Sequence, residues 1–285
     1  MRFERDNMDE FHTKWLKNRV HKEMTDSTSN DISRLALGGA PEGTIVTADI
    51  QTAGKGRRGR SWESTAGTSL LFSLLLRPKL KPDTAPQITL LMAMAVTKAV
   101  RRLTGLDAYI KWPNDVVVNG KKVCGILTEM QLRDGGIDFV VVGTGVNVNQ
   151  TSIPVELEGS ATSLLLEKER LLALEKTVSE PCDGKKFEKE TCFDRDVLLE
   201  HILNGFEDYY TLFLQKQDFS DLMTEYNEWL VSLDKEVKVL DPKGEFTGIS
   251  KGINEKGELL VALPDGSVTA IYAGEVSVRG LYGYV

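Results

Sequence analysis

The amino-acid sequence predicts an α+β fold, in which a mixed, largely antiparallel sheet carries flanking helices and a smaller β-rich unit follows it. Between residues 115 and 149, apolar runs follow one another through short turns, which is the pattern of consecutive antiparallel strands. From residue 236 onward, short apolar runs again alternate with turns, whereas residues 160–232 have mostly helical spacing. We therefore expect two domains, at residues 1–233 and 234–285.

The elements of the first hundred residues follow from the spacing of apolar side chains. They are, in chain order, helices at 9–23 and 30–37, strands at 44–50 and 69–76, and a helix from 84 to 103. Thr84 and Gln87 have the spacing of a capping box, and Gly105 is placed to end this last helix. One face of the helix is expected to be core: Ile88, Leu91, Met92, Ala95 and Ala99.

Asn119–Gly120 lies between two apolar runs and is the strongest short signal for a β-hairpin, because both turn positions need a positive φ. Since side chains alternate along a strand, we expect Lys122 to face Asp115 and Lys121 to face the opposite side. An ion pair at a sheet edge would give the same pattern. Gly125 in the return strand, however, favours the close approach of a ligand.

The second half of the chain is expected to change from helices to strands. Residues 160–232 are mostly helical in their spacing, with Asp194 capping a helix, and the polar stretch at 170–192 is interpreted as a surface loop. Five short strands are then expected at 236–240, 246–253, 259–263, 267–272 and 275–278. Such strands are enough for a small barrel.

The segment from Gln51 to Trp62 is the most informative part of the chain for function. It places three glycines and four cations in seven positions: Gly54, Lys55, Gly56, Arg57, Arg58, Gly59 and Arg60. Glycine lets the backbone approach a ligand and arginine matches phosphate or carboxylate oxygens, so the segment predicts an anion-binding loop. A solvated basic loop would have the same composition. Neither the P-loop spacing nor the Gly-x-Gly-x-x-Gly spacing of dinucleotide folds is present.

Charge and composition narrow the class of protein. The net charge of −7 and the pI of about 5.2 argue against a nucleic-acid binder, which usually carries a basic excess. No apolar stretch approaches the roughly 18 residues of a membrane span, and the charged N-terminus lacks an apolar signal region. The three cysteines and three histidines do not have metal-ligand spacing. We expect a cytoplasmic protein that binds no membrane.

Five motifs stand in a specific order along the chain: Asp26-Ser-Thr-Ser29, Gln51-Thr-Ala-Gly-Lys-Gly-Arg-Arg-Gly-Arg-Ser-Trp62, Lys111-Trp-Pro-Asn-Asp115, Lys122-Val-Cys-Gly-Ile-Leu127 and Gly143-Thr-Gly-Val-Asn147. In order and spacing they resemble the biotin protein ligases. The resemblance covers about residues 20–165 well and the last fifty residues more loosely. It implies a class II synthetase-like catalytic domain that binds biotin and ATP, followed by an SH3-like β-barrel.

The resemblance implies an activity in two steps. Members of this family activate biotin with ATP to biotinyl-5′-adenylate, release pyrophosphate, and then transfer biotin to one lysine of a biotin carboxyl carrier domain. The implied ligands are therefore biotin, ATP and Mg²⁺, which would bridge the phosphates. Positioned cations would stabilise the meeting of the carboxylate with the α-phosphate. The glycine-rich loop would close over the mixed anhydride and exclude water.

The resemblance also implies residue roles. Arg57 would stabilise the α-phosphate, Lys122 would hold carboxylate and phosphate oxygens, and Asp115 would orient ATP with its metal or receive the proton of the acceptor lysine. The implied biotin contacts are Ser27, Thr28, Ser29, Gln51, Lys55, Gly56, Arg57, Lys122 and Gly125. The implied contacts to ATP or the adenylate are Arg58, Arg60, Trp62, Asn114 and Asn147, and no metal site made by protein ligands is implied.

Two positions depart from the pattern of the family. Asn is common where Ser29 stands, and arginine is common where Lys55 stands, so Lys55 keeps the charge but loses bidentate geometry. Ser27, Thr28 and Ser29 also have the form of a helix N-cap. Both interpretations agree, because the start of a helix offers free N–H groups to a ligand.

Other functions stay open at this stage. Lipoate ligases share the catalytic architecture but lack the Gly-Arg-Arg-Gly-Arg-Ser-Trp loop in this form. A non-catalytic adenylate-binding module and a nucleic-acid-binding module are further alternatives. About 25 residues precede Asp26, too few for the DNA-binding domain that some family members carry, so no DNA binding is expected. The carrier protein is not identified, and the oligomeric state is open between monomer and homodimer.

Overall fold

The computed structural model describes residues 16–178, 192–241, 244–272, 277–280 and 284–285. Its main element is a seven-stranded sheet with the order β1-β2-β3-β7-β6-β5-β4. The strands are β1 Asn18–Thr25, β2 Thr44–Gln51, β3 Ser69–Leu76, β4 Ala108–Lys111, β5 Asp115–Val118, β6 Lys121–Arg133 and β7 Gly136–Asn147. Strands β1 and β2 pair in parallel and the other neighbours pair antiparallel, so the predicted mixed sheet is confirmed.

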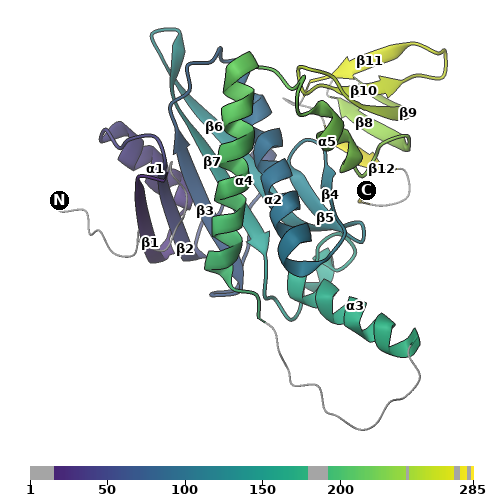
Figure 1. Ribbon diagram of the computed structural model, residues 1–285, viewed down its shortest axis with the longest axis horizontal. Coiled ribbons are helices and arrows are strands. Elements are labelled where there is room, and N and C mark those ends of the chain that lie inside the picture. The colour runs from purple at the N-terminus through teal and green to yellow at the C-terminus, as the bar shows by residue number, and fades with distance from the viewer. Residues whose placement is uncertain (1–15, 179–191, 242–243, 273–276, 281–283) are drawn as a thin grey trace.

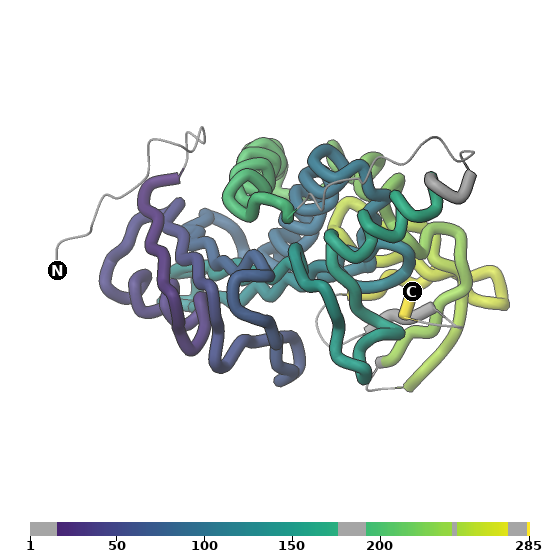
Figure 2. Tube along the Cα trace, turned by 90° about the horizontal axis from the view of Figure 1, so that it is seen from below, coloured from purple at the N-terminus to yellow at the C-terminus, as the bar shows by residue number. Residues whose placement is uncertain are grey.

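Helices lie on both faces of the large sheet, with α2 and α4 on one face and α1 on the other. The described α-helices are α1 Thr28–Leu37, α2 Ile88–Thr104, α3 Leu164–Val178, α4 Arg195–Lys216 and α5 Met223–Glu228. Helices α2 and α4 lie side by side over one face, as Figures 1 and 2 show from two directions. Because side chains alternate along β2, Ile45 points into the core under α2 and α4, whereas Val46 points into a separate core under α1.

The hairpin turns predicted from the sequence are confirmed. Asn119 and Gly120 join β5 to β6 with φ angles of 49° and 73°, the two left-handed positions that Asn-Gly tolerates. Asp134 and Gly135 join β6 to β7 in the same way, with φ angles of 52° and 79°. Strands β5, β6 and β7 therefore form one meander in which each strand pairs with the next.

The helix predicted at residues 9–23 is wrong for its described part, because residues 18–25 form strand β1. Backbone pairing with β2, from Asn18 opposite Thr44 to Thr25 opposite Gln51, overrides the helical spacing of the sequence. The remainder of that expected helix, residues 9–15, lies outside the described residues. Helix α1 and strands β2 and β3 agree with prediction.

Two details of the helices differ from expectation. Thr84 has helical φ and ψ and makes no side-chain capping bond, because a short 3₁₀ turn at Ala85–Gln87 leads into α2 in place of the expected capping box. Gly105 ends α2 with a φ of 70°, as predicted. The surface loop expected at 170–192 is wrong up to residue 178, which α3 reaches, and residues 179–191 lie outside the described residues.

The C-terminal strands form a second, smaller antiparallel sheet with the order β11-β10-β9-β8-β12. They are β8 Glu236–Asp241, β9 Gly244–Ile253, β10 Leu259–Ala262, β11 Val268–Ile271 and β12 Ser277–Gly280. The indole N–H of Trp112 donates to the carbonyl of Gly257 at 3.1 Å, and one apolar core runs through both sheets. The domain boundary at 233/234 stays a prediction.

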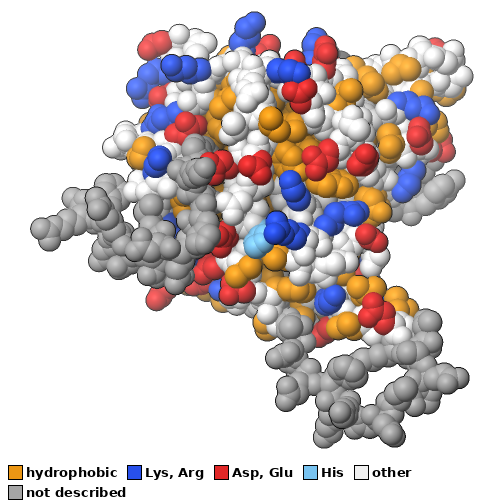
Figure 3. Space-filling model, in the orientation of Figure 1, with side chains coloured by type: hydrophobic (Ala, Val, Ile, Leu, Met, Phe, Trp, Pro, Cys, Tyr) orange, Lys and Arg blue, Asp and Glu red, His pale blue; other side chains and the backbone are white. Residues whose placement is uncertain are grey.

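On the face covered by α2 and α4, positively and negatively charged side chains are mixed. Figure 3 shows Lys and Arg side chains interspersed with Asp and Glu side chains over the surface drawn in colour. A nucleic-acid footprint would instead gather basic side chains on one face or along one helix. Within the described residues, no helix is long and apolar enough to span a bilayer.

Candidate active site

A cleft of about 460 Å³ opens on the face of the large sheet that carries α1, opposite the α2–α4 layer. Three separate motifs line it: the start of α1, the basic loop after β2, and the glycine-bearing strands β6 and β7. The lining residues are Ser27, Thr28, Ser29, Gln51, Lys55, Gly56, Arg57, Trp62, Asn114, Lys122, Gly125, Ile126, Leu127, Gly143, Thr144 and Gly145.

At one end of the cleft, polar groups of α1 and β2 form a hydrogen-bonding pocket. Ser27 is the N-cap residue of α1, yet its hydroxyl makes no capping bond, so it is available to a ligand. Gln51 Oε1 accepts from the backbone N–H of Thr28 at 2.8 Å and from its hydroxyl at 3.0 Å. The side-chain amide of Gln51 is thereby held with its oxygen toward α1.

Ser73 of β3 completes this pocket, and sequence reasoning missed it. Its buried hydroxyl lies 2.8 Å from that of Thr28 and 3.0 Å from that of Ser29. Ser73 sits inside an otherwise apolar strand, which was the signal that could have singled it out. Because Thr28 donates its one hydroxyl hydrogen to Gln51, Ser73 donates to Thr28 and accepts from Ser29.

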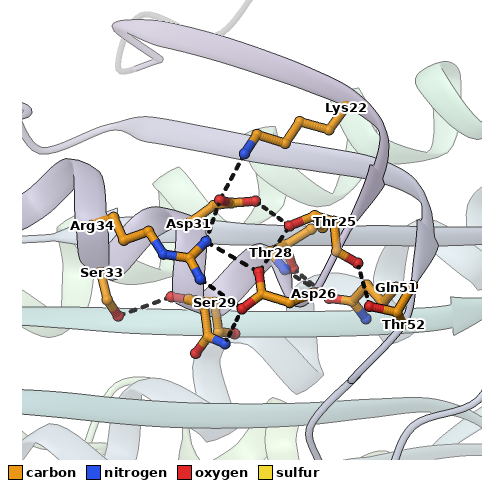
Figure 4. Close-up of polar contacts among 11 residues, drawn as sticks. Lys22, Thr25, Asp26, Thr28, Ser29, Asp31, Ser33, Arg34, Gln51 and Thr52 are labelled. Carbon is orange, nitrogen blue, oxygen red and sulfur yellow. Dashed lines mark hydrogen bonds and ion pairs between the residues drawn. The ribbon is translucent and has the colours of Figure 1, made fainter.

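A charged network holds the start of α1 in place (Figure 4). Asp26, which precedes the helix, pairs with Arg34 at 2.6 Å and accepts from the amide of Asn30 at 2.7 Å. Asp31 lies one turn inside the helix, is nearly buried, and binds Lys22 at 2.7 Å and Arg34 at 2.8 Å. The Arg34 guanidinium, with help from Asn30, holds the pKa of the Asp26 carboxyl well below its ordinary value of 3.8.

The basic loop folds back on itself over the cleft. The backbone N–H of Trp62 donates to the carbonyl of Gly54 at 2.9 Å, and that of Gly56 donates to the carbonyl of Arg60 at 2.7 Å. Within this loop, the Lys55 ammonium lies 3.2 Å from Glu129 of β6. One side of the loop therefore lies against the sheet, while residues 58–61 are exposed.

Arg57 points from the loop toward the opposite wall of the cleft. Its guanidinium donates to the side-chain oxygen of Asn114 at 2.9 Å. Burial lowers the pKa of Arg57 from its ordinary value of 12.5, and the nearby carboxylate of Asp115 acts in the opposite direction. An arginine remains charged under such a shift, so the cleft holds a partly desolvated cation.

The β5–β6 hairpin supplies the second cation. The Lys122 ammonium lies 2.6 Å from Asp115 Oδ1, whereas the Lys121 ammonium donates to the carbonyl of Glu158 at 2.6 Å, away from the cleft. Only Lys122 lines the cleft, so the directions predicted for the two lysines are confirmed, although the β5–β6 register shifts between Val116 and Val117. Asp115 lies behind Lys122 and its side chain is 13% exposed.

The Trp62 indole lies on a floor made of glycines. A Cβ atom at Gly145 would stand 2.6 Å from Trp62 Cε2, and one at Gly125 would stand 2.8 Å from Trp62 Cζ3, so both strands need glycine here. The Lys122 ammonium lies 5.5 Å from the indole centroid. The buried indole N–H has no hydrogen-bond partner among the described residues, which leaves it available to a ligand.

Three of the residues assigned from sequence to the adenylate do not line this cleft. Arg58 and Arg60 are exposed on the outer side of the loop, with Arg58 at a φ of 59°. The Asn147 amide donates to the carbonyl of Thr162 at 3.0 Å and its oxygen accepts from Gln150, so it braces the end of β7. The adenylate contacts assigned to these three residues stay predictions.

A second hollow of about 640 Å³ continues the cleft past Arg57 and Asn114 toward the N-terminal end of α2. Its remaining walls are mostly apolar and include Pro86, Pro113 and Met130. Together, the cleft and this hollow run from the hydrogen-bonding pocket at α1, past the cations Arg57 and Lys122, to an apolar opening. Among the described residues, no group of three or more His, Cys, Asp or Glu side chains is placed to hold a metal ion.

Comparison with known proteins decides the family. The chain matches the Biotin/lipoate A/B protein ligase family over residues 21–147 and the Biotin protein ligase C terminal domain over residues 232–279. It is 30% identical over 258 residues to the biotin–[acetyl-CoA-carboxylase] ligase of Mycobacterium tuberculosis, covering 88% of this chain and 85% of that protein. The chain belongs to the biotin protein ligase family. The predicted enzyme class is confirmed with it.

Other members of the biotin protein ligase family agree in sequence and structure. The bifunctional ligase/repressor BirA of Bacillus subtilis is 34% identical over 261 residues, covering 91% of this chain and 73% of that protein. The biotin protein ligase from Aquifex aeolicus, solved in complex with biotin and ATP, is 32% identical with a TM-score of 0.75. That likeness covers 93% of this chain and 100% of the other, so the small C-terminal sheet is part of the shared fold.

Proposed function

We propose that this biotin protein ligase family member activates biotin with ATP and transfers the biotinyl group to a lysine of a carrier domain. The observation that carries the proposal is the order of groups along one cleft. Hydroxyls and an amide at α1 suit a neutral ureido ring, and Arg57 and Lys122 follow where a carboxylate and a phosphate would meet.

In the first step, a carboxylate oxygen of biotin attacks the α-phosphorus of ATP, the bond to the β-phosphate oxygen breaks, and pyrophosphate leaves. Two anions must approach each other, so fixed cations lower the barrier. Lys122 is held by Asp115 and Arg57 by Asn114, so both charges are oriented before substrate arrives. Trp62 offers a flat apolar surface and a free N–H donor beside them, which suits the adenine side of the adenylate.

In the second step, the amine of the acceptor lysine attacks the carbonyl carbon of the mixed anhydride, and AMP leaves with the phosphate oxygen. The amine loses one proton, which passes to Asp115 or to solvent. The acceptor belongs to a biotin carboxyl carrier protein or domain. The apolar hollow beyond Arg57 gives an aliphatic lysine stem a route to the anhydride.

Mg²⁺ enters the proposal as the companion of ATP. A magnesium ion usually binds through substrate phosphates and one or two carboxylates, and it keeps several waters. Asp115 is the carboxylate beside the two cations, and it is already paired with Lys122. Phosphate oxygens of ATP would therefore supply most of the ligands. A cytoplasmic location, a homodimer and the lack of operator binding stay predictions.

Mass spectrometry of the adenylate formed tests the proposal against its nearest alternative. The protein is incubated with ATP and Mg²⁺, together with biotin or with lipoate. We expect a biotinyl-adenylate that stays bound through a desalting column, and biotin but not lipoate on a carboxyl carrier domain added afterwards. Lipoyl-adenylate in place of biotinyl-adenylate would transfer the assignment to the lipoate ligases.

A further inference from the structure

Tyr284, near the C-terminus, contacts the turn that carries Asp115. Its hydroxyl donates to Asp115 Oδ2 at 2.5 Å, and its ring centroid lies 3.3 Å from the Lys111 ammonium. The next residue, Val285, lies close to the hairpin turn, since a Cβ at Gly120 would stand 3.1 Å from its Cγ2. The placement of Tyr284 therefore rests on contacts with the loop ends of both β4–β5 and β5–β6.

The Asp115 carboxylate divides its two oxygens between different partners. Oδ1 receives the Lys122 ammonium at 2.6 Å and the Asn114 amide at 3.1 Å, while Oδ2 receives Tyr284. A carboxylate with donors on both oxygens cannot turn about its last torsion without breaking a hydrogen bond. Tyr284 therefore fixes which oxygen faces Lys122.

We propose that Tyr284 is a positioning residue for the Asp115–Lys122 ion pair, through which the C-terminal unit helps to set the geometry of the cleft. Tyr284 follows strand β12, which pairs with β8 in the small sheet, so the chain that leaves the small sheet contacts the large one at Asp115. A charge stabilises a transition state only where it is held in the right place. The proposal rests on the proposed function for its kinetic consequence and on geometry alone for the ion pair.

The substitution Tyr284→Phe isolates the hydroxyl. Phenylalanine keeps the ring under Lys111, and it removes the hydroxyl that donates to Asp115 Oδ2. Tyr272→Phe is the matched control, because it removes the hydroxyl of a half-exposed tyrosine that directly follows strand β11 of the small sheet.

Steady-state kinetics of adenylation, followed by pyrophosphate release, is the first measurement. We expect Tyr284→Phe to lower kcat about tenfold, less than the roughly 10²–10³ of a directly acting group, with KM for biotin and ATP within about twofold. Tyr284→Phe should stay folded at the assay temperature, and the kcat and KM of Tyr272→Phe should match those of wild type. An unchanged kcat, an equal loss in Tyr272→Phe, or a loss confined to KM overturns the proposal.

A double-mutant cycle tests whether Tyr284 acts through Asp115. In an Asp115→Ala background the ion pair no longer exists, so adding Tyr284→Phe should change the remaining rate by less than about twofold. A further tenfold loss in that background would mean that Tyr284 acts by another route, and the proposal would fall.

An NMR measurement separates failure of this proposal from failure of the proposed function, because it needs no turnover. The protein is labelled with [ε-¹³C]lysine, and the Lys122 and Lys121 signals are assigned from Lys122→Arg and Lys121→Arg. Tyr284→Phe should move the Lys122 signal and leave that of Lys121 in place. If the signal moves in a protein that makes no biotinyl-adenylate, the positioning role holds and the proposed function fails; if the Lys122 signal does not move, the positioning role is wrong.

Discussion

Gly145 and Gly125 lie on neighbouring strands beneath Trp62, and the missing side chains are what bring the indole onto the sheet. For single residues, the sequence predicted those site residues whose signal lies in neighbouring positions of the chain. The glycines and cations of the basic loop predicted an anion-binding loop, and the resemblance to the biotin protein ligases implied that Arg57 and Lys122 share one site, as the cleft shows. Ser73 and Tyr284 were missed because their partners lie 45 and 169 residues away along the chain.

Gly145→Ala should displace Trp62 without unfolding the protein. The new Cβ would stand 2.6 Å from a rigid ring, which must therefore move off the strand. Overpacking of this kind typically costs about 1–3 kcal/mol, so we expect KM for ATP to rise roughly tenfold, together with a change in tryptophan fluorescence. Gly136→Ala on the same strand is the control, since its Cβ would lie 3.9 Å from the nearest contact. Equal kinetics in the two variants would contradict the packing argument.

At the scale of elements, the hairpins were predictable and the edge strand was not. Asn119–Gly120 defines its turn by backbone conformation alone, so the sequence contains the whole signal. Strand β1 exists through its pairing with β2 and has few apolar side chains, so its own spacing gives no period-two signal. The capping box at Thr84 failed for a related reason, since a 3₁₀ turn before α2 placed that residue inside the helical path.

The basic loop should respond to ligand as one element. Trypsin cleaves after Arg57 and Arg58 only when the loop opens, and a bound adenylate places a phosphate against the loop and favours its closed form. We expect cleavage at these two bonds to slow at least about tenfold with biotin, Mg²⁺ and ATP, while cleavage after Lys216 or Arg133 keeps its rate. Identical rates with and without ligands would exclude closure of the loop.

Asp26, at the start of α1, should make the free energy of unfolding depend on pH in the acid range. The folded protein lowers the pKa of Asp26, so the unfolded chain binds this proton more readily. The stability contributed by Asp26 is therefore present above its ordinary pKa of 3.8 and is lost as the pH falls below it. Melting curves should show Asp26→Asn below wild type at pH 7, with the difference in melting temperature beginning to narrow below about pH 4.5 and narrowing further at every lower pH. Asp134→Asn, in an exposed turn, is the control. If the difference in melting temperature between Asp26→Asn and wild type does not change with pH, the Asp26–Arg34 pair does not cause the acid dependence.

At the scale of the whole molecule, helices α2 and α4 lie on one face of the large sheet, and α1 and the cleft lie on the other. The face with the cleft combines α1, the basic loop and the glycine strands. The small C-terminal sheet packs against the same large sheet and brings Tyr284 to Asp115. Sequence patterns predicted both sheets, but not how one reaches the site of the other, because that contact depends on packing between distant segments.

The central claim is that Lys122, fixed by Asp115, meets the carboxylate and the α-phosphate, while Lys121 does not. Pyrophosphate release by Lys122→Ala and Lys121→Ala, measured side by side with biotin and ATP, tests it most directly. Loss of a preorganised charge costs roughly 10²–10³ in rate, so we expect that loss for Lys122→Ala. Lys121 only binds the carbonyl of Glu158, so Lys121→Ala should stay within about twofold of wild type. A Lys122→Ala enzyme as fast as wild type, or a slower Lys121→Ala enzyme, would contradict the account.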